Sequence, residues 1–580
     1  MTMTLPAPAM IDQGLINDLL SMPVVGSTPQ YRTVIAPFTG AALYELPLSA
    51  EQDVQAAVDA ARQAQREWAA RPLRERRRVM LRYHDLVLQH RDQAMDLIQA
   101  ENGKARRDAM EEVLDVAITA RHYARDARRL LKPQRHRGAL PLLVGVREVR
   151  HPKGVVGVIS PWNYPFTLAA SDAIPALLAG NAVVLKPDVQ TTLTALFAIR
   201  LLRDAGLPAP LIQVDTGEGP EVGPMVIDRV DYVMFTGSTP VGRFVASRCG
   251  DRLIGCSLEL GGKNALIVRA DADPDRAAEI ALRACFANSG QLCISAERIY
   301  VNESIQDRFL AAFLPRVAQM NLQAGLQWGA DMGSLITAKQ FERVQEHVDD
   351  AVRQGATVLV GGRARPEVGP YFFEPTVLAN VDERMTLCET ETFGPVAAVY
   401  PVSSDAEAVR RANDSPYGLN AAIITRNRAE GRRLAAQIKT GTVNVNEGYA
   451  AAWGSTRAPM GGMGDSGIGR RHGDEGLLKY TEAQTIATQR ALGFGAPFGW
   501  SDRRWGQVLT VSLGAMKRFG LKSCPTKTWP AGPPTTPART RSDWTGPHAT
   551  AYLPEQTGLG YSAGASGERR RQPRWRPAPG

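Results

Sequence analysis

The stretch that begins at Gly154 constrains the fold most, because short apolar segments alternate there with segments of helical periodicity. The apolar segments are Val155 to Ile159, Ala182 to Leu185, Ile212 to Val214, Tyr232 to Phe235 and Asn264 to Val268. Alternation at this spacing predicts a parallel sheet with helices on both faces, which is an α/β fold. Ligands bind such sheets at the carboxyl ends of the strands, so functional residues are expected just after these segments.

The length of the chain and the spacing of its cysteines favour a large globular protein of a reducing compartment. The chain has 580 residues, of which 44% are hydrophobic, enough for two large domains. No basic residue precedes Arg32 and no run of about 18 apolar residues occurs, so neither a signal peptide nor a membrane-spanning helix is predicted. The six cysteines, at 249, 256, 285, 293, 388 and 524, lack CxxC spacing. We expect a cytoplasmic protein without disulfides or a metal.

The net charge of +9 is concentrated near the C-terminus. Residues 525–580 contain eight Lys and Arg against three acidic residues, which supplies +5 and leaves +4 for the rest. The rest of the chain has no basic motif interleaved with aromatic residues, so nucleic acid is not expected as a partner. Ten prolines among these 56 residues, together with many Gly, Thr and Arg, predict a disordered tail over 523–580.

Cys293 lies in a segment that interrupts a helical pattern. The segment from Ala287 to Ser295 contains Gly290 and several polar residues, and it follows the helical pattern of Ala277 to Phe286. A turn is expected there, with free backbone N–H groups that would favour the thiolate and lower the pKa of the thiol. The alternative is that Cys293 is a small buried apolar residue, as most lone cysteines are.

Three other turns carry polar residues that could act with a nucleophile. Glu259 ends an apolar strand before two glycines, where a general base is plausible. Asn163 follows the strand that ends near Ser160 and offers an amide to an oxyanion. Glu391 lies in a turn bounded by glycine and proline. Each segment by itself is more often an ordinary loop, but they occur together.

In this order and at these separations, the four segments closely resemble the aldehyde dehydrogenase superfamily, from about Gln30 to about Gln489. Within it, the chain is most similar to the NADP-dependent succinate-semialdehyde dehydrogenase branch, in an actinobacterial-type second form. The resemblance implies that Cys293 attacks the aldehyde and forms a thioester, and that Asn163 and the Cys293 N–H hold the oxyanion. It also implies that Glu259 activates the hydrolytic water and that Glu391 binds the nicotinamide ribose.

A second group of residues is expected to hold the cofactor. Lys186 ends an apolar strand, and a following helix begins near Pro240, so the N–H groups of Gly237 and Ser238 should face a pyrophosphate. NAD-preferring relatives commonly have a carboxylate where Val189 stands, so NADP is expected, with NAD possible. The resemblance implies a cofactor-contacting set of Trp162, Asn163, Lys186, Pro187, Asp188, Val189, Gly237, Ser238, Leu260, Glu391 and Phe393.

The resemblance also implies a division of the chain and a self-association. A cofactor-binding domain is expected at 1–136 and 152–261, a catalytic domain at 262–473, and a β oligomerisation arm at 137–151 and 474–492. The arm implies a homodimer or a homotetramer. Residues 493–522 should form an amphipathic helix, centred on 502–521, which packs on its own subunit, covers the substrate entrance or makes a weak contact with a membrane surface.

The substrate is where the chain departs from its apparent branch. Well-known succinate-semialdehyde dehydrogenases carry arginines where this chain has Ala287 and Ser171, and Arg457 is the one nearby replacement that the sequence suggests. We therefore expect inefficient oxidation of succinate semialdehyde and better efficiency with a more apolar aldehyde. Ser295 stands where some relatives have a redox-active cysteine, so thiol-disulfide regulation of this loop is not expected.

Two other functions remain open at this point. A relative that passes the acyl group to coenzyme A would share the cysteine chemistry, but it would not need a hydrolytic base at Glu259. A catalytically silent structural or binding homologue would not need Cys293, Asn163 and Lys186 together. Aldehyde-dependent formation of NAD(P)H would separate an enzyme from a silent homologue.

Overall fold

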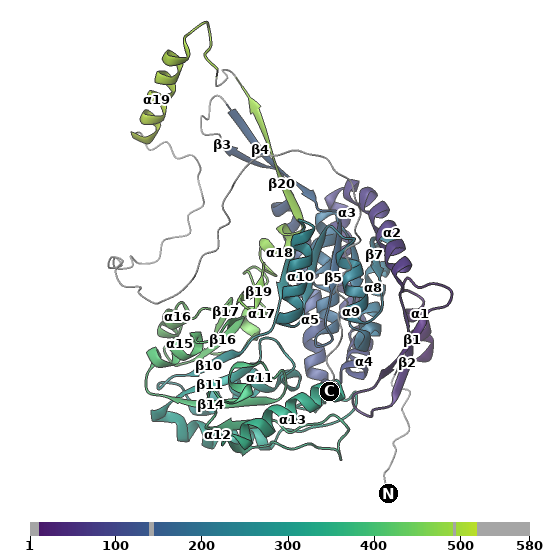
Figure 1. The fold of residues 1–580 in the computed structure, drawn as a ribbon, viewed down its shortest axis with the longest axis vertical. Coiled ribbons are helices and arrows are strands. Elements are labelled where there is room, and N and C mark those ends of the chain that lie inside the picture. Colours follow the sequence, from purple (N-terminus) through teal and green to yellow (C-terminus); the bar gives the residue numbers. More distant parts are fainter. Residues whose placement is uncertain (1–10, 138–143, 491–494, 519–580) are drawn as a thin grey trace, which may run out of the picture. The chain divides into compact units, whose positions relative to one another are not determined.

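The computed structural model describes residues 11–137, 144–490 and 495–518. Its first large sheet, in which Figure 1 labels β5, β7 and β19, has six strands in the order β19-β9-β8-β5-β6-β7. All neighbours are parallel except β19, which runs antiparallel to β9. The strands are β5 (Val155–Ile159), β6 (Ala182–Lys186), β7 (Ile212–Val214), β8 (Tyr232–Thr236), β9 (Gly255–Glu259) and β19 (Gly467–Ile468). The predicted α/β class is confirmed.

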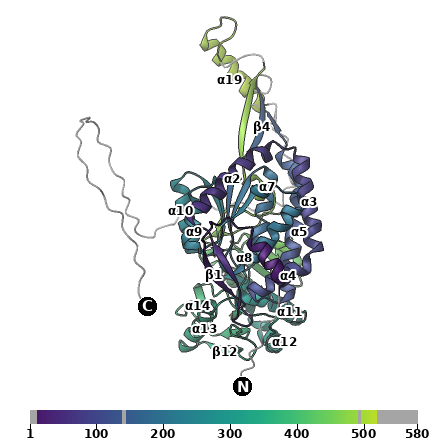
Figure 2. The ribbon, with the colours of Figure 1, turned by 90° about the vertical axis from the view of Figure 1, so that its right-hand side faces the viewer.

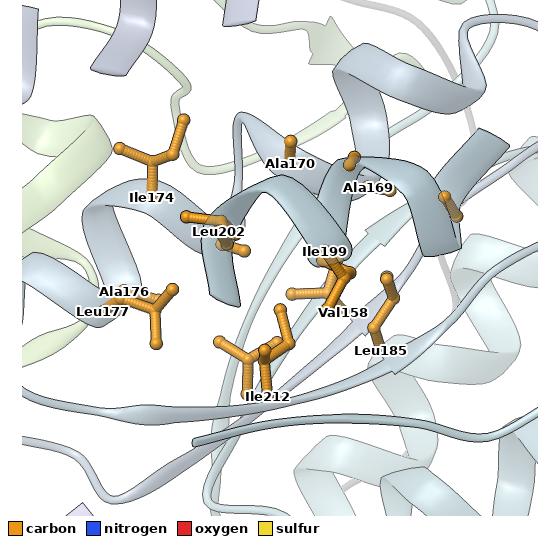
Figure 3. Packing of buried hydrophobic residues seen from close by; sticks show 14 of the residues in the cluster. Val158, Ala169, Ala170, Ile174, Ala176, Leu177, Leu185, Ile199, Leu202 and Ile212 are labelled. Atoms are coloured by element: carbon orange, nitrogen blue, oxygen red, sulfur yellow. The ribbon is translucent and has the colours of Figure 1, made fainter. Parts of the chain in front are cut away.

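Helices cover this sheet because its strands are apolar on both sides. Val158, Leu185 and Ile212 come from three adjacent strands and are almost completely buried against α6, α7 and α8 (Figure 3). The helices of this part are α1 (Gln13–Leu20), α2 (Glu51–Ala70), α3 (Leu73–Gln89), α4 (Arg91–Asn102), α5 (Arg106–Leu131), α6 (Pro165–Ala170), α7 (Ala173–Ala179), α8 (Thr192–Asp204), α9 (Gly219–Ile227) and α10 (Thr239–Asp251).

The second large sheet has seven strands in the order β12-β13-β14-β11-β10-β16-β17. Side chains alternate along β10, so that Ala265 and Ile267 join one core cluster and Leu266 and Val268 join another. The prediction that Asn264 to Val268 continues the first sheet is therefore wrong, because this strand pairs with β11 and β16. The strands are β10 (Asn264–Val268), β11 (Ala296–Asn302), β12 (Thr357–Val360), β13 (Thr376–Ala379), β14 (Val396–Val402), β16 (Asn420–Ile424) and β17 (Thr442–Val445).

Helices pack on both faces of the second sheet, as the two core clusters require. They are α11 (Pro274–Phe286), α12 (Gln306–Ala318), α13 (Ala338–Arg353), α14 (Thr386–Glu389), α15 (Asp405–Asn413), α16 (Arg428–Ala435) and α17 (Ala450–Trp453). The short helix α18 (Glu475–Leu478) instead contacts α5 and α7, and its Leu477 belongs to the core of the first sheet. Two smaller sheets are antiparallel pairs of strands: β1 (Gln30–Ile35) with β2 (Ala42–Leu48), and β15 (Tyr417–Gly418) with β18 (Met463–Gly464).

A three-stranded antiparallel sheet stands apart from both large sheets (Figure 1, Figure 2). Its strands are β3 (Gln134–Arg137), β4 (Val144–Pro152) and β20 (Thr481–Gln489). The last helix, α19, spans Asp502–Arg518, within the expected range of 502–521. The predicted disorder of 523–580 lies outside the described residues. Among the residues that are described, no helix is both long and apolar enough to cross a membrane.

Candidate active site

Cys293 lies in a turn between α11 and β11, as predicted. The helix is broken by Asn288 and Ser289, whose φ values of 51° and 55° lie in the left-handed region. Gly290 follows with φ 68°, and a Cβ there would come within 2.0 Å of the Gly394 carbonyl oxygen. A hydrogen bond stabilises this break, because the Asn288 N–H donates to Asp108 Oδ2 at 3.0 Å. Cys293 therefore follows a buried turn whose backbone conformation is fixed by close packing and by this hydrogen bond.

Backbone contacts fix the orientation of Cys293. The Asn264 amide donates to the Cys293 carbonyl oxygen at 2.8 Å and also to the Ser295 carbonyl. Within the described residues, the Cys293 N–H donates to no other residue. That N–H is consequently available beside the sulfur, where an oxyanion would form.

The environment of the thiol differs from the expectation. Burial, followed by the nearby carboxyls of Glu391 and Glu259, raises the pKa of Cys293 to about 12. The predicted lowering of this pKa is wrong for the protein without a ligand, because desolvation of a thiolate outweighs the favourable backbone dipoles. Cys293 is thus a thiol at neutral pH, and it would need a base to act as a nucleophile.

Asn163 is buried and its position is fixed through Lys104. The Lys104 ammonium donates to the Asn163 carbonyl oxygen and to Glu112 Oε1, each at 2.7 Å. Lys104 and Glu112 are both fully buried. The Asn163 side-chain amide donates to the Gln291 carbonyl at 3.2 Å. An amide nitrogen carries two hydrogens, so one remains for a ligand next to Cys293.

Glu259 ends β9 and is 5% exposed. Its Oε1 has no hydrogen-bond partner in the described part of the chain. Burial raises the pKa of Glu259 to about 7, and the nearby Arg471 opposes the shift. Arg471 itself donates two hydrogen bonds to the Asp172 carboxylate, one from Nε and one from Nη2. Glu259 is therefore a carboxyl with an unsatisfied acceptor and a pKa near neutrality, as a general base requires.

Two cavities meet at Cys293. One is lined by Trp162, Gly237, Ser238, Leu260, Glu391 and Phe393 among others, and the second by Glu111, Asp115, Tyr164, Trp453, Met460 and Arg471 among others. Asn163, Thr236, Glu259 and Cys293 line both. The structure thus brings the three expected catalytic residues together at the junction of two spaces.

The first cavity contains most of the expected cofactor residues. The rings of Trp162 and Phe393 meet edge to face, with centroids 5.4 Å apart. Glu391 Oε1 accepts a hydrogen bond from the Gly262 N–H at 3.0 Å, and burial raises the pKa of Glu391 to about 8. The expectation of a free N–H on Gly237 is wrong, because that group donates to the Glu259 carbonyl at 3.0 Å.

Lys186 ends β6 outside the lining of either cavity, and Pro187, Asp188 and Val189 follow it. Lys186 is 4% exposed, and its ammonium makes no hydrogen bond or ion pair with a described residue. A buried, unpaired ammonium is costly, so this group fits an anionic or hydroxylated ligand at the carboxyl edge of the sheet. Asp188 accepts the Gln190 N–H at 3.0 Å, and Val189 begins a short 3-10 turn.

The second cavity lacks the arginines that the branch would supply. Ser171 is buried and donates to Asp115 Oδ2 at 2.7 Å, and Ala287 is 1% exposed. Arg457 does not replace them, since its side chain is 77% exposed and pairs with Asp126. Arg471, which does line the cavity, is already paired with Asp172.

Several positioning residues were not found from the sequence. Lys104 and Asn288 both donate to the Asn163 carbonyl oxygen, and Glu112 pairs with Lys104. These residues are distant from Asn163 in the sequence, and nothing local marks them as its neighbours. Arg471 falls in a loop rich in glycine and arginine without a distinguishing signal. Asn264 could have been suspected, because it directly follows the glycine turn after Glu259.

The aldehyde dehydrogenase family model matches residues 24–486. The chain belongs to the aldehyde dehydrogenase family. Nicotinamide-dependent oxidation of an aldehyde is therefore its reaction, and the resemblance inferred from the four turns is confirmed. The family match covers both large sheets and the three-stranded sheet except the last three residues of β20.

Curated relatives are similar over most of the chain. A protein of Mycolicibacterium smegmatis, provisionally named succinate-semialdehyde dehydrogenase [NADP(+)], is 52% identical over 515 residues, which is 89% of this chain and 99% of that protein. A Mycobacterium tuberculosis protein with the same provisional name, numbered 2, is 51% identical over 87% of this chain and 97% of its own length.

Solved structures show the same fold. An NADP-dependent enzyme of E. coli is 32% identical, with a TM-score of 0.77 over 82% of this chain and 99% of that chain. A Staphylococcus aureus betaine aldehyde dehydrogenase variant in complex with NAD+ is 31% identical, with a TM-score of 0.77 over 82% of this chain and 97% of that chain.

Proposed function

We propose that this aldehyde dehydrogenase forms a thioester on Cys293 and hydrolyses it with Glu259, using NADP and accepting NAD. The observation that carries the proposal is the junction of two cavities at Cys293, Asn163 and Glu259. One cavity suits a planar ring beside Trp162 and Phe393, and the other suits an aldehyde. A bound nicotinamide cofactor would accept the hydride that leaves the aldehyde carbon.

The residues of the chain have separate tasks in this scheme. Glu259, with a pKa of about 7, removes the proton from the Cys293 thiol directly or through water, and the thiolate attacks the carbonyl carbon. Asn163 and the Cys293 N–H donate to the oxygen as it becomes negative. Glu259 then releases the thiol proton to solvent. After oxidation it takes a proton from water, the hydroxide attacks the thioester carbon, and the acid leaves as the Cys293 sulfur regains a proton from Glu259.

The cofactor preference rests on two residues. Lys186 is a buried cation that makes no hydrogen bond or ion pair in the described structure, and Val189 adds no carboxylate to those of Asp188 and Glu218 nearby. Relatives that are 51% and 52% identical carry NADP(+) in their names, which supports the same preference here. Val189→Glu should shift the ratio of kcat/KM values towards NAD, because the new carboxylate would repel a 2′-phosphate. A wild-type preference for NAD would contradict the proposal.

The substrate is succinate semialdehyde or a related, more apolar aldehyde. The names of the relatives favour succinate semialdehyde. The second cavity favours a less charged compound, since Glu111 and Asp115 line it and its lining cation, Arg471, is paired. We propose measurable but inefficient turnover of succinate semialdehyde for this reason.

The alternatives predict different products. Transfer of the acyl group to coenzyme A would require no hydrolytic base, yet Glu259 has an unsatisfied oxygen at the cavity junction. A silent homologue would form no reduced cofactor. We therefore propose to follow NADPH formation with an aldehyde panel, with and without coenzyme A. Product formation that depends on coenzyme A would support the first alternative, and no NADPH with any aldehyde would support the second.

The proposal extends to the assembly and the location of the enzyme. We propose a homodimer or homotetramer built through the β3–β4–β20 sheet, because β20 is paired on one edge and its Ile486 is 44% exposed. We also propose a cytoplasmic enzyme, which agrees with five free cysteines among the described residues. Light scattering of the full-length chain would test the assembly, and a monomeric mass would contradict it.

A further inference from the structure

Three buried lysines invite comparison. Lys104, Lys186 and Lys263 are 0%, 4% and 2% exposed. Lys104 is paired with Glu112, and Lys263 with Glu297. Lys186 has neither a hydrogen bond nor an ion pair to any residue that the structure describes. Since an unpaired buried ammonium is unfavourable, Lys186 is the one of the three that is prepared for a ligand.

The surroundings of Lys186 contain a charged pair from distant parts of the chain. A Cβ added to Gly219, the first residue of α9, would lie 4.0 Å from the Lys186 ammonium nitrogen. The residue before it, Glu218, forms an ion pair with Arg32 of β1, with 3.0 Å between Nη1 and Oε1. Both side chains are partly exposed, 58% for Arg32 and 37% for Glu218. The pair therefore borders the same strand end as Lys186 and is open to a ligand.

The charges at this edge are balanced only because Arg32 is present. Lys186 and Asp188 interact electrostatically with each other and with Glu218. Arg32 also interacts electrostatically with Asp188. Without Arg32, two carboxylates would face one ammonium. A free Glu218 carboxylate would then repel a phosphate and accept hydrogen bonds from ribose hydroxyls. With Arg32 in place, Glu218 is neutralised and a second cation stands near Lys186.

We propose that Arg32 selects the cofactor: it neutralises Glu218 and, with Lys186, takes the 2′-phosphate of NADP, an inference that rests on the cofactor site proposed above. Arginine suits this task because its planar guanidinium can bind a phosphate and a carboxylate at the same time through separate N–H groups. Arg32 thereby compensates for Asp188 and Glu218, which would otherwise favour NAD.

The test compares two adenosine compounds that differ in the 2′-phosphate alone. Binding of 2′,5′-ADP and of 5′-AMP to the full-length protein would be measured by isothermal titration calorimetry, which requires no catalysis. Arg32→Gln should weaken 2′,5′-ADP about tenfold or more and change 5′-AMP less than about threefold, since one charge-assisted contact to the phosphate is lost. Glu218→Gln should strengthen 2′,5′-ADP, and Arg32→Gln combined with Glu218→Gln should recover part of the loss.

The control is Arg363→Gln, which removes another exposed arginine that is paired with a glutamate, Glu374, away from this edge. It should change neither affinity. Equal weakening of both compounds by Arg32→Gln, or no weakening, would overturn the role of Arg32 while the cofactor site stands. A wild-type protein that binds neither compound would overturn the cofactor site and the role of Arg32 together.

Discussion

At the scale of single residues, a raised pKa does not by itself mark a functional carboxyl. Burial raises the pKa of both Glu101 and Glu259 to about 7. Glu101 accepts hydrogen bonds from Tyr44, Leu193 and Thr194, and so closes the first turn of α8. Glu259 has an oxygen with no partner in the described residues, and that carboxyl lines both cavities. An unmet acceptor on a carboxyl that lines the cavities, rather than the pKa, distinguishes the proposed base.

Glu259→Gln should separate the two half-reactions. A glutamine can take a proton neither from the Cys293 thiol nor from water. Water can replace it in the single proton transfer from the thiol, so NADPH should still form in a slower first-turnover burst, while steady-state turnover falls about 100-fold or more. In the wild type, the deacylation rate should rise with pH up to about 7 and then level off, because the base must be ionised. The burst and the pH profile would be measured by stopped-flow absorbance of NADPH.

Two results bear on this prediction directly. Cys293→Ala should fold and form no NADPH at all, which provides the matched blank for the burst. Full turnover by Glu259→Gln would assign deacylation to another group. Activity in Cys293→Ala would remove the thioester from the mechanism.

Asp115 should oppose substrates with a distal carboxylate. It lines the aldehyde cavity, and burial raises its pKa to about 6, so it is mostly ionised above neutral pH. Asp115→Asn keeps the shape and removes the charge. It should lower the KM for succinate semialdehyde several-fold and leave the KM for butanal within about twofold. Steady-state kinetics with the two aldehydes would measure this.

The wild-type enzyme should also distinguish the two aldehydes by the charge of the substrate. Butanal should have a higher kcat/KM than succinate semialdehyde, since no unpaired cation lines the described cavity. A micromolar KM for succinate semialdehyde, together with lower efficiency on every uncharged aldehyde, would show that other groups replace the missing arginines.

At the scale of elements, the sequence predicted the buried strands best. The bounds of β5, β7 and β10 match the predicted segments, because each strand is mostly apolar and is followed by polar or turn residues. The assignment of β10 to a sheet failed, since pairing depends on long-range contacts that periodicity does not encode. The same holds for the site: the turns were found, whereas Lys104 and Asn288, which donate to the Asn163 carbonyl, became apparent only in three dimensions.

The amphipathic pattern of helix α19 predicts its apolar side but not which of its apolar residues are buried. Trp505 is buried, yet Val511 and Leu513 are 71% and 52% exposed. The helix carries four Lys and Arg and one Asp, which suits an anionic surface. Val511→Asp with Leu513→Asp should reduce partitioning of the full-length protein to vesicles that contain anionic lipid, and should leave KM values unchanged. Sedimentation with vesicles would measure this.

The matched control for α19 is Thr510→Asp with Ser512→Asp, which adds the same charge without removing apolar side chains. It should reduce partitioning less than the apolar pair does. Equal effects of both double variants would reduce the contact to net charge. A changed aldehyde KM in the Val511→Asp, Leu513→Asp protein would instead assign α19 to the substrate entrance.

At the scale of the whole molecule, buried carboxyls make stability depend on pH. Burial raises the pKa values of six of them to between about 6 and about 8: Glu101, Glu111, Asp115, Asp215, Glu259 and Glu391. A carboxyl with a raised pKa binds its proton more tightly in the folded chain than in the unfolded one. Its contribution to stability is therefore present at low pH and lost as pH rises through the folded pKa.

Asp215 offers the sharpest test of this dependence. It is 0% exposed, neither of its oxygens has a partner among the described residues, and burial, with a smaller effect of Asp53, raises its pKa to about 8. The folded chain keeps the proton up to about pH 8, while the unfolded chain loses it near pH 4. Each pH unit between these values costs about 1.4 kcal/mol of stability at this residue, so the wild type should lose about 3 kcal/mol from it between about pH 6 and pH 9.

Asp215→Asn removes the titration and keeps the size of the side chain. The free energy of unfolding of the variant, measured by urea denaturation, should therefore lie close to that of the wild type at about pH 6 and exceed it at about pH 9. His347 and His472, whose pKa values burial lowers to about 4 and about 3, act in the opposite direction but complete their effect by about pH 6.5, below this window. Asp204→Asn, at an exposed residue paired with Arg200, is the control and should give a curve parallel to the wild type. If the Asp215→Asn curve is also parallel to the wild type, Asp215 is ionised in the folded protein and has a counter-charge that the structure does not place beside it.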